Sequence, residues 1–455
     1  MRRFISVLTL LLFHSALEGF VVAQEKDVAV TVYNNNLALV KDVRTLELKK
    51  GEIEVKFTDV ASQIDPTSVH FKSITAPEKV AILEQNYEYD LVSPSKILEK
   101  YIDKKIRVFT EGDKVYEGTL LSYREGDIVL SEPEGGIRTL RGKSIRHIEY
   151  PALPEGLITR PTLIWLLQND KRGKHRTEVS YLTNGVNWHA EYVAVVNPED
   201  TRLELGGWVS IDNKSGATYE NAKLKLIAGE VHRVEERRRL MRERTYALEA
   251  KAAAVPQFEE KAFFEYHMYT LQRRATIKDR QIKQMSLFPN AEVEARKIFT
   301  YDGRQDDKKV RVNLEFKNSQ AAGLGIPLPK GKVRVYKEDV DKSLEFIGED
   351  LIDHTPKDEK VRIYLGNAFD IVGERTVIER ERIADRVREE KVEIKLRNHK
   401  DVDVTVVVVE HLYGDWKIIS SSQEYRKKDA KTIEFDVRVA KDAESVLTYR
   451  VRYTW

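Results

Sequence analysis

The sequence predicts a mainly β protein composed of antiparallel β-sandwich domains, the last of them immunoglobulin-like, with an inserted small SH3/Sm-like barrel and a short helical excursion. The prediction depends first on short runs of alternating apolar and polar residues, separated by Gly, Asn and Asp turns, over most of the chain after residue 26. This alternation is typical of strands that bury one face of an antiparallel sheet. It depends second on length, because 455 residues exceed what one ordinary core holds.

The composition restricts the class of protein. The chain contains no Cys, so hydrophobic burial and sheet hydrogen bonds must stabilise the fold without disulfides. Charged residues make up 33% of the chain, and 76 Lys and Arg nearly balance 74 Asp and Glu. This balance favours a mixed-charge surface and argues against a nucleic-acid partner.

The first 23 residues have the pattern of a signal peptide. Arg2 and Arg3 precede a mostly apolar run over residues 4–17, and the small-residue pattern Val-Val-Ala ends at Ala23. We therefore expect an exported protein, periplasmic or extracellular, after cleavage near Ala23. A retained membrane anchor is the alternative, but the apolar run is shorter than the ~20 residues that span a bilayer. The mature chain is expected to have no transmembrane segment.

Two segments follow the signal peptide. Residues 24–92 are predicted to form an N-terminal antiparallel β region, in which apolar and polar residues alternate through Val28, Val30 and Val32. Residues 93–150 are predicted to form the inserted small barrel, because PSKILEKYIDKK has the pattern of an amphipathic helix and about five strands follow it. Since fold alone does not fix function, a passive insert is favoured over a module that binds nucleic acid or peptides.

The remaining segments are four. We expect a central β-sandwich region at 151–229, a charged helical or mobile excursion at 230–261, a continuation of the sandwich at 262–374, and the immunoglobulin-like sandwich at 375–455. The excursion is predicted because EERRR and its Ala-rich surroundings lack Gly. The last sandwich is predicted because VTVVVVEHL is a nearly continuous β-branched run, as in a strand buried in a sheet.

Several stretches together carry a family resemblance, namely VTVYNNNLALVKDVRTLELKKG, GVNWHAEYVAVV, WVSIDNKSGATYENAKLKLIAGE, EYHMYTLQRRATIKDRQIKQMSLF and the run that begins IPLPKGKVRVYKEDVDKSLEFIGED. They resemble the domain-of-unknown-function 4139 family of exported bacterial proteins, some of which carry the label mucoidy inhibitor A. The resemblance covers nearly all of the mature chain. It implies a predominantly β protein outside the cytoplasm, with no established activity and no catalytic residues to transfer. Relatives often contain a coiled coil, for which this chain offers only the shorter 230–257 segment and the inserted barrel.

Standard catalytic motifs are absent from the sequence. It contains no HExxH, no GxSxG, no Walker-type phosphate loop and no Cys for thiol catalysis. This absence favours a protein that is not an enzyme and needs no cofactor. Two short stretches nevertheless contain a His and a Glu two residues apart.

The first stretch is NWHAEYVAVV, residues 187–196. As a strand, it would turn Trp188 and Tyr192 into the core and place His189 and Glu191 about 7 Å apart on the other face. The second stretch is FFEYHMYTL, residues 263–271. As a single strand, it would place Glu265, His267 and Tyr269 on one face, with Phe264, Tyr266 and Met268 opposite.

If these strands are neighbours, the four residues His189, Glu191, Glu265 and His267 form a plausible ligand set for a divalent transition metal, or a general acid–base site. The simpler interpretation is that each His and Glu is part of a solvated pair on a sheet surface. The four-residue set supports the alternative that the protein is a metal-dependent hydrolase of an envelope substrate.

The interpretation that the sequence favours is an exported β-sandwich protein that binds an envelope protein or polymer. The candidate binding residues are aromatic or basic, namely Phe263, Phe264, Tyr266, Tyr269, Arg237, Arg238 and Arg239. The arginines have a simpler interpretation as a solvated helix face. A further alternative is a self-associating structural subunit whose exposed edge strands pair between copies.

Overall fold

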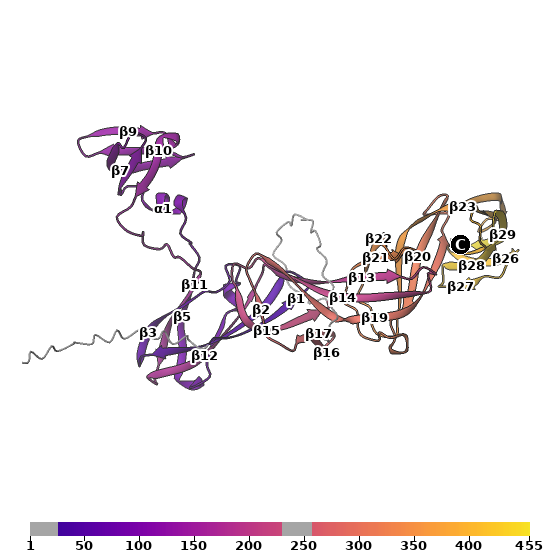
Figure 1. Cartoon of the computed structure of the whole chain (residues 1–455), viewed down its shortest axis with the longest axis horizontal. Coiled ribbons are helices and arrows are strands. Elements are labelled where there is room, and N and C mark those ends of the chain that lie inside the picture. Colours follow the sequence, from indigo (N-terminus) through magenta and orange to yellow (C-terminus); the bar gives the residue numbers. More distant parts are fainter. Residues whose placement is uncertain (1–25, 230–256) are drawn as a thin grey trace, which may run out of the picture.

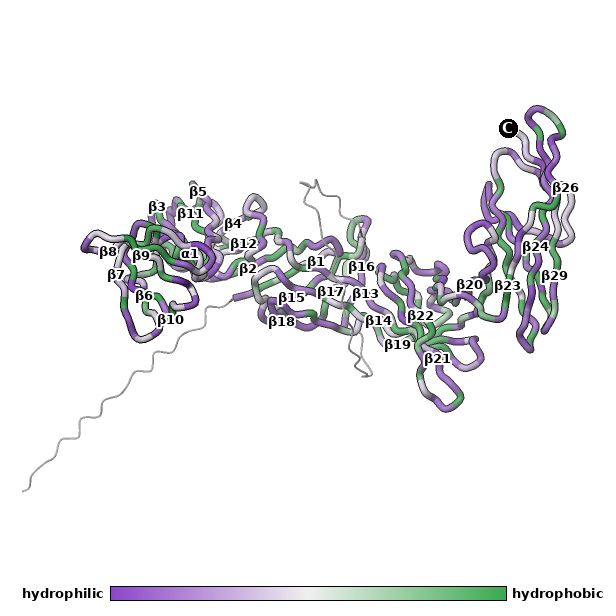
Figure 2. The backbone as a smooth tube through the Cα atoms, turned by 90° about the horizontal axis from the view of Figure 1, so that it is seen from above, coloured by the Kyte–Doolittle hydropathy of each residue, from purple (hydrophilic) through white to green (hydrophobic). Residues whose placement is uncertain are grey.

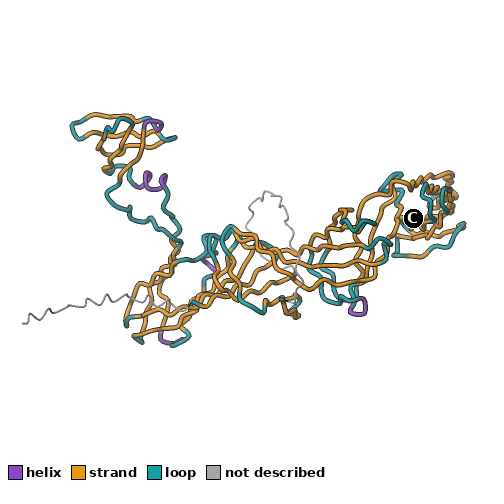
Figure 3. Tube along the Cα trace, viewed as in Figure 1, coloured by secondary structure: helices purple, strands orange, loops and turns teal. Residues whose placement is uncertain are grey.

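The computed structural model describes residues 26–229 and 257–455. It confirms the predicted mainly β fold, with 29 strands and one α-helix in these ranges. Figure 1 shows an elongated molecule with the C-terminal strands at one end, and Figure 3 shows that strands and short connections make up nearly all of it. No helix in the described ranges is long and apolar enough to cross a membrane.

An eight-stranded sheet forms the middle of the N-terminal half. Its strands, in order, are β16 (Phe258–Phe263), β17 (Tyr266–Leu271), β15 (Tyr219–Ala228), β1 (Asp27–Tyr33), β2 (Leu37–Leu48), β12 (Gly173–Thr183) and β4 (His70–Ser73), with β18 (Ala275–Ile277) paired to β15. The pairing of β1 with β15 is parallel, although the neighbouring pairs are antiparallel. The predicted alternation in β1 is confirmed, since Val28, Val30 and Val32 are buried.

A three-stranded sheet extends this half of the molecule. Its order is β3 (Gly51–Thr58), β11 (Thr162–Asn169) and β5 (Val80–Glu88). Trp165 on β11 is fully buried and packs against Phe57 and Phe71, with ring centroids 5.6 and 4.9 Å away. Because Phe71 belongs to β4, this contact joins the two sheets into one core.

A thirteen-stranded sheet occupies the rest of the chain. The main path runs β22 (Leu344–Ile352), β21 (Gly331–Glu338), β13 (Val186–Val196), β14 (Arg202–Asn213), β19 (Gln281–Tyr301), β20 (Lys309–Lys317), β23 (Lys360–Ala384), β24 (Val387–Asn398), β29 (Ala443–Thr454) and β26 (Asp415–Ser421). Off this path, β25 (Val404–His411) pairs with β19 and with β28 (Thr432–Val439), and β27 (Arg426–Lys427) pairs with β28. The sheet curls until β22 lies beside β23, where the amide of Tyr364 donates to Asp350 at 2.7 Å.

Two large hydrophobic cores lie along the molecule and share three long strands. The first core joins the N-terminal sheets to the start of the thirteen-stranded sheet, and the second fills its C-terminal part. Strands β19, β20 and β23 contribute Met285, Leu314 and Ile363 to the first core, and Tyr301, Val310 and Ile371 to the second. The predicted boundary between residues 374 and 375 therefore falls inside β23, which runs through it without a break. Figure 2 shows hydrophobic and hydrophilic residues alternating along these strands.

The C-terminal strands form two facing layers around the second core. Phe435 on β28 stacks on Tyr449 of β29 with centroids 5.6 Å apart, so these strands belong to opposite layers. The predicted strand is confirmed, and Val404, Val406, Val408 and Val409 are buried. Its burial is less continuous than expected, because Thr405 is exposed and Val407 is half-buried. The core itself begins earlier than residue 375, with Phe299.

The inserted module has its own small core and one open sheet. It contains α1 (Pro94–Lys100) and the strands β10 (Ile145–Glu149), β6 (Lys105–Thr110), β7 (Val115–Arg124), β8 (Asp127–Glu132) and β9 (Gly136–Leu140), in this sheet order. Strands β9 and β10 are the two edges and do not pair, so the small barrel expected here does not close. Two chain segments, bridged between Leu91 and Ile158, attach the module, which stands away from the sheets in Figure 1.

Candidate functional site

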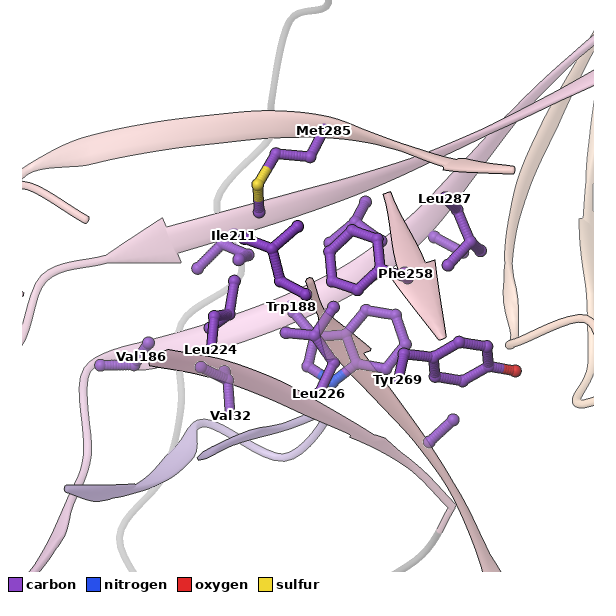
Figure 4. Packing of buried hydrophobic residues seen from close by; sticks show 14 of the residues in the cluster. Val32, Val186, Trp188, Ile211, Leu224, Leu226, Phe258, Tyr269, Met285 and Leu287 are labelled. Carbon is purple, nitrogen blue, oxygen red and sulfur yellow. The ribbon is translucent and has the colours of Figure 1, made fainter. Parts of the chain in front are cut away.

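Trp188 is a core residue, as the alternation of its strand predicts. Its indole is fully buried and donates a hydrogen bond to the Ile227 carbonyl at 3.1 Å, and Tyr192 donates to the Pro329 carbonyl at 2.7 Å. Figure 4 shows Trp188 beside Tyr269, whose ring centroid is 6.2 Å away. Tyr269 is buried, so the prediction that it lies on a binding surface is wrong.

Glu191 is held by neighbours on the outer face of its sheet. Its carboxylate accepts hydrogen bonds from Gln284 at 2.8 Å and Ser210 at 3.3 Å, and it lies 3.5 Å from the His189 imidazole and 3.9 Å from Arg334. The hydrogen bond with His189 is the largest cause that lowers the pKa of Glu191, and Arg334 adds to it. These contacts involve both oxygens of the carboxylate. The oxygens therefore hold neighbouring side chains and are not open to a metal ion.

The second His and Glu pair has a different arrangement from the expected one. FFEYHMYTL is a hairpin and not a single strand, since β16 ends at Phe263 and Phe264 and Glu265 form the turn before β17. His267 pairs with Glu260 across the hairpin, with Nδ1 2.7 Å from the carboxylate oxygen. Glu265 is an exposed turn residue.

The two pairs do not converge. Trp188 faces Tyr269 across the core, and adjacent residues of a strand point to opposite faces, so His189 points away from the hairpin. Within residues 26–229 and 257–455, no group of three or more His, Asp or Glu side chains is arranged to hold a metal ion. The four-residue ligand set is therefore not assembled in this structure.

A Ser and His pair elsewhere in the fold is buried and is not accessible to a substrate. The Ser73 hydroxyl lies 3.0 Å from Nδ1 of His175, whose Nε2 lies 2.6 Å from the Lys171 carbonyl. Both side chains are buried, and the hydroxyl also accepts from the Ala76 amide at 3.1 Å. The pair therefore fastens β4 to β12, and its hydroxyl is not open to a substrate.

The tip of the β16–β17 hairpin exposes two aromatic rings. Phe263 is 51% exposed and Phe264 is 84% exposed, and Phe264 has a φ of +57°. Tyr266 lies 6.1 Å from the Phe264 ring and rests on Gly229, where an added Cβ would lie 2.5 Å from the Tyr266 ring. The sequence predicted these three aromatics as binding residues, but it gave no sign of the turn, because FFEY contains none of the usual turn formers.

The base of this hairpin is anchored in the first core. Phe258 pairs with Leu271 at the start of the ladder, and both side chains are buried. Tyr269 donates a hydrogen bond to the Pro327 carbonyl at 2.9 Å, which ties β17 to the segment before β21. The tip therefore extends from a fixed support. The other predicted binding residues, Arg237, Arg238 and Arg239, lie outside the described residues.

Two polar features of the structure have little or no signal in the sequence. Lys297 and Lys337 both pair with Asp200 at the rim of a hollow in the thirteen-stranded sheet. These residues are far apart in the chain, so no spacing signal joins them. Glu410 is buried in the second core beside Arg375. Its position at the end of VTVVVVEHL, after a buried run, was the available signal.

Two family models match the chain. The model described as Domain of unknown function (DUF4139) matches residues 177–455, more than half of the chain. The chain belongs to the DUF4139 family. The model described as N-terminal domain of unknown function (DUF4140) matches residues 30–108. No curated protein matches the sequence. The DUF4139 region begins within β12 and includes the aromatic hairpin and both polar features, whereas the DUF4140 region runs from β1 into the inserted module.

Proposed function

We propose that this DUF4139-family protein is an exported, non-catalytic binding protein that docks a partner protein of the envelope on the tip of its β16–β17 hairpin. The observation that carries the proposal is the backbone of Phe264. Its φ of +57° belongs to the left-handed region, and its ring is 84% exposed. The binding surface consists of Phe263, Phe264 and Tyr266, which we name the aromatic tip.

The left-handed conformation is costly for a residue with a bulky side chain. It costs roughly 1–2 kcal/mol relative to Gly or Asn, which take such turn positions at little expense. The fold gains little in return from Phe264, since the residue is 84% exposed and, among residues 26–229 and 257–455, its ring contact is with Tyr266. A strained residue that the fold does not need supports a role outside the fold.

The chemistry of the aromatic tip suits an apolar pocket on a protein. Aromatic side chains bury a large area with few rotatable bonds and dominate the binding energy of many interfaces. The tip is also pre-arranged, because Tyr266 is packed on Gly229 and the base of the hairpin lies in the core. Pre-arrangement lowers the entropy lost on binding.

Export is supported by the N-terminal segment. Arg2 and Arg3, the apolar run and the small residues that end at Ala23 have the order of a cleaved signal peptide. The mature protein is then periplasmic or extracellular and begins near Gln24. N-terminal sequencing of the protein from envelope fractions tests this part directly, since an intact Met1 would contradict cleavage.

A photoreactive phenylalanine analogue at the aromatic tip tests the binding role. Placed at position 264 in the full chain, it should cross-link one specific envelope protein in living cells. Placed at position 369, where the native Phe369 is 95% exposed on β23, it should not cross-link that protein. The partner is then purified, and its affinity for Phe264→Ala should fall by at least about thirtyfold, as for an interface hot spot of about 2 kcal/mol. Equal cross-linking from both positions, or unchanged affinity, would overturn the proposal.

A further inference from the structure

A hollow of about 250 Å³ opens in the curled part of the thirteen-stranded sheet. Its lining residues come from β13 and the turn after it, and from β19, β20, β21, β22 and β23. Its apolar lining comprises Val196, Val312, Leu314, Ile347 and Leu365. None of these residues belongs to the aromatic tip, so the hollow is a separate site.

Charged residues line the hollow at one side. Asp200 is in the turn after β13 and has a φ of +58°. Lys337 on β21 places Nζ 2.6 Å from one carboxylate oxygen of Asp200, and Lys297 on β19 pairs with the other oxygen. Burial alone would raise the pKa of Asp200, but the hydrogen bonds and charges of the two lysines lower it below its ordinary value.

The charge balance of this cluster is positive. Two ammonium groups face one carboxylate, which leaves a formal charge of +1 beside the apolar lining. Each ammonium has three N–H donors, so one contact with Asp200 does not use them all. Both lysine side chains are partly exposed, so a ligand can reach them from solvent.

We propose that this hollow binds a small carboxylate with a short apolar tail. The tail lies against Leu314, Ile347 and Leu365, and the carboxylate accepts hydrogen bonds from Lys297 and Lys337. The volume holds roughly eight non-hydrogen atoms at the ~30 Å³ that a water molecule occupies in the liquid. Hexanoate has this size and this chemistry. An anion is favoured over a neutral ligand because charge-assisted hydrogen bonds are about twice as strong as neutral ones.

A methyl NMR titration of the mature full-length protein tests the proposal. The methyl groups of Val312, Leu314, Ile347 and Leu365 line the hollow and report on its occupancy. Hexanoate should shift these signals with a Kd of about 1 mM, which is typical of a ligand with so few atoms. Hexanamide, which has the same number of non-hydrogen atoms and no charge, should bind at least about tenfold more weakly.

A matched pair of lysine variants locates the charge that matters. Lys337→Met keeps an unbranched apolar side chain, one atom shorter than that of Lys, and removes the ammonium, and it should weaken hexanoate at least about tenfold while leaving hexanamide unchanged. Lys332→Met removes a charge from the same strand, where Lys332 pairs with Glu349 instead, and should change neither affinity.

Three results would overturn the proposal. These are no saturable shift of the lining methyl groups with hexanoate, equal affinity for hexanamide, and an unchanged hexanoate affinity in Lys337→Met. The first two are measured on the wild-type protein, so they decide the question even if a variant fails to fold. None of these measurements involves the aromatic tip, so they leave the proposed docking function to its own test.

Discussion

The second core and the aromatic tip each contain a residue in an unusual environment. The core buries a charged side chain, and the tip exposes an aromatic one. Glu410 is fully buried in the sandwich, whereas Phe264 is 84% exposed at the end of a hairpin. The buried carboxylate has partners for both oxygens, whereas in the described part of the chain the exposed ring contacts the Tyr266 ring alone. We therefore expect Glu410 to contribute to the stability of the fold and Phe264 to contribute little to it.

The partners of Glu410 explain how a charge is accommodated inside the sandwich. Arg375 on β23 donates from Nε to both carboxylate oxygens, at 2.9 and 3.1 Å, and from Nη2 at 3.0 Å. The Tyr449 hydroxyl donates a further hydrogen bond. Burial is the largest cause that raises the pKa of Tyr449, and the charge of Glu410 adds to it, so the hydroxyl keeps its proton and remains a donor. The group thereby joins β23, β25 and β29.

The largest effect is expected from Glu410→Ala. The variant leaves the largely buried Arg375 guanidinium, whose side chain is 11% exposed, without its carboxylate, which should cost about 3–5 kcal/mol of unfolding free energy. Chemical denaturation at neutral pH measures the loss. The matched control is Glu374→Ala, which removes a half-exposed partner of Arg397 and should cost under about 1 kcal/mol. Similar losses in both variants would remove the distinction between the buried pair and the surface.

A smaller and pH-dependent effect is expected at Glu315 on β20. Burial alone would raise the pKa of Glu315, but hydrogen bonds from Arg362 and Arg296 lower it to about 2. A carboxylate with a lowered pKa stabilises the fold above its unfolded value, near 4.5, and this stabilisation is lost as the pH falls towards 2. Glu315→Gln should therefore cost about 1–2 kcal/mol at pH 7, because both arginines are substantially exposed and their charges are screened.

Denaturation of Glu315→Gln and of the wild-type protein at several pH values provides the check. The difference in stability should shrink as the pH falls from about 4.5 towards 2, because the wild-type carboxyl gains its proton and comes to resemble the amide. A difference that stays constant over this range would show that the charge of Glu315 contributes nothing to stability.

The smallest effect is expected from a chelator. Gln284, Ser210, His189 and Arg334 surround Glu191, and His267 is paired with Glu260, so neither pair needs a metal ion to hold its position. EDTA should leave the melting temperature unchanged within about 1 °C, a shift that corresponds to about 1 kcal/mol for a chain of this size if it unfolds as one unit. A clear fall, restored by a transition metal, would revive the hydrolase alternative.

Local patterns in the sequence predicted much of the first core. The alternation around Trp188 and Tyr192 placed both residues correctly, because a strand with one buried face has a period of two. The prediction for Tyr269 failed because its face of β17 packs into the first core beside Trp188. The turn at Phe264 and Glu265 was missed because the composition of residues 263–271 does not indicate it. Tertiary contacts of the anchored hairpin stabilise a conformation at Phe264 that local preference disfavours.

Pairing between strands that are far apart in the chain could not be predicted from the sequence. The parallel ladder of β1 with β15 joins residues 29–33 to residues 223–227, and no local pattern specifies such a partner. The same holds for the cluster of Asp200, Lys297 and Lys337, which forms only when three strands meet. Charged residues alternate along many strands of this chain. The sequence alone therefore does not distinguish the few that form a cluster in the fold from the others.

The role of Phe264 is tested most directly by comparing Phe264→Gly with Phe264→Ala. Two quantities are measured, the unfolding free energy and the affinity for the cross-linked partner. Glycine relieves the left-handed strain, so Phe264→Gly should gain about 0.5–1 kcal/mol of stability, whereas Phe264→Ala keeps the strain and should gain none. Both variants lose the ring and should bind the partner at least about thirtyfold more weakly. Retained affinity in either variant, or a loss of stability in Phe264→Gly, would contradict the claim that Phe264 is held in a strained turn for binding.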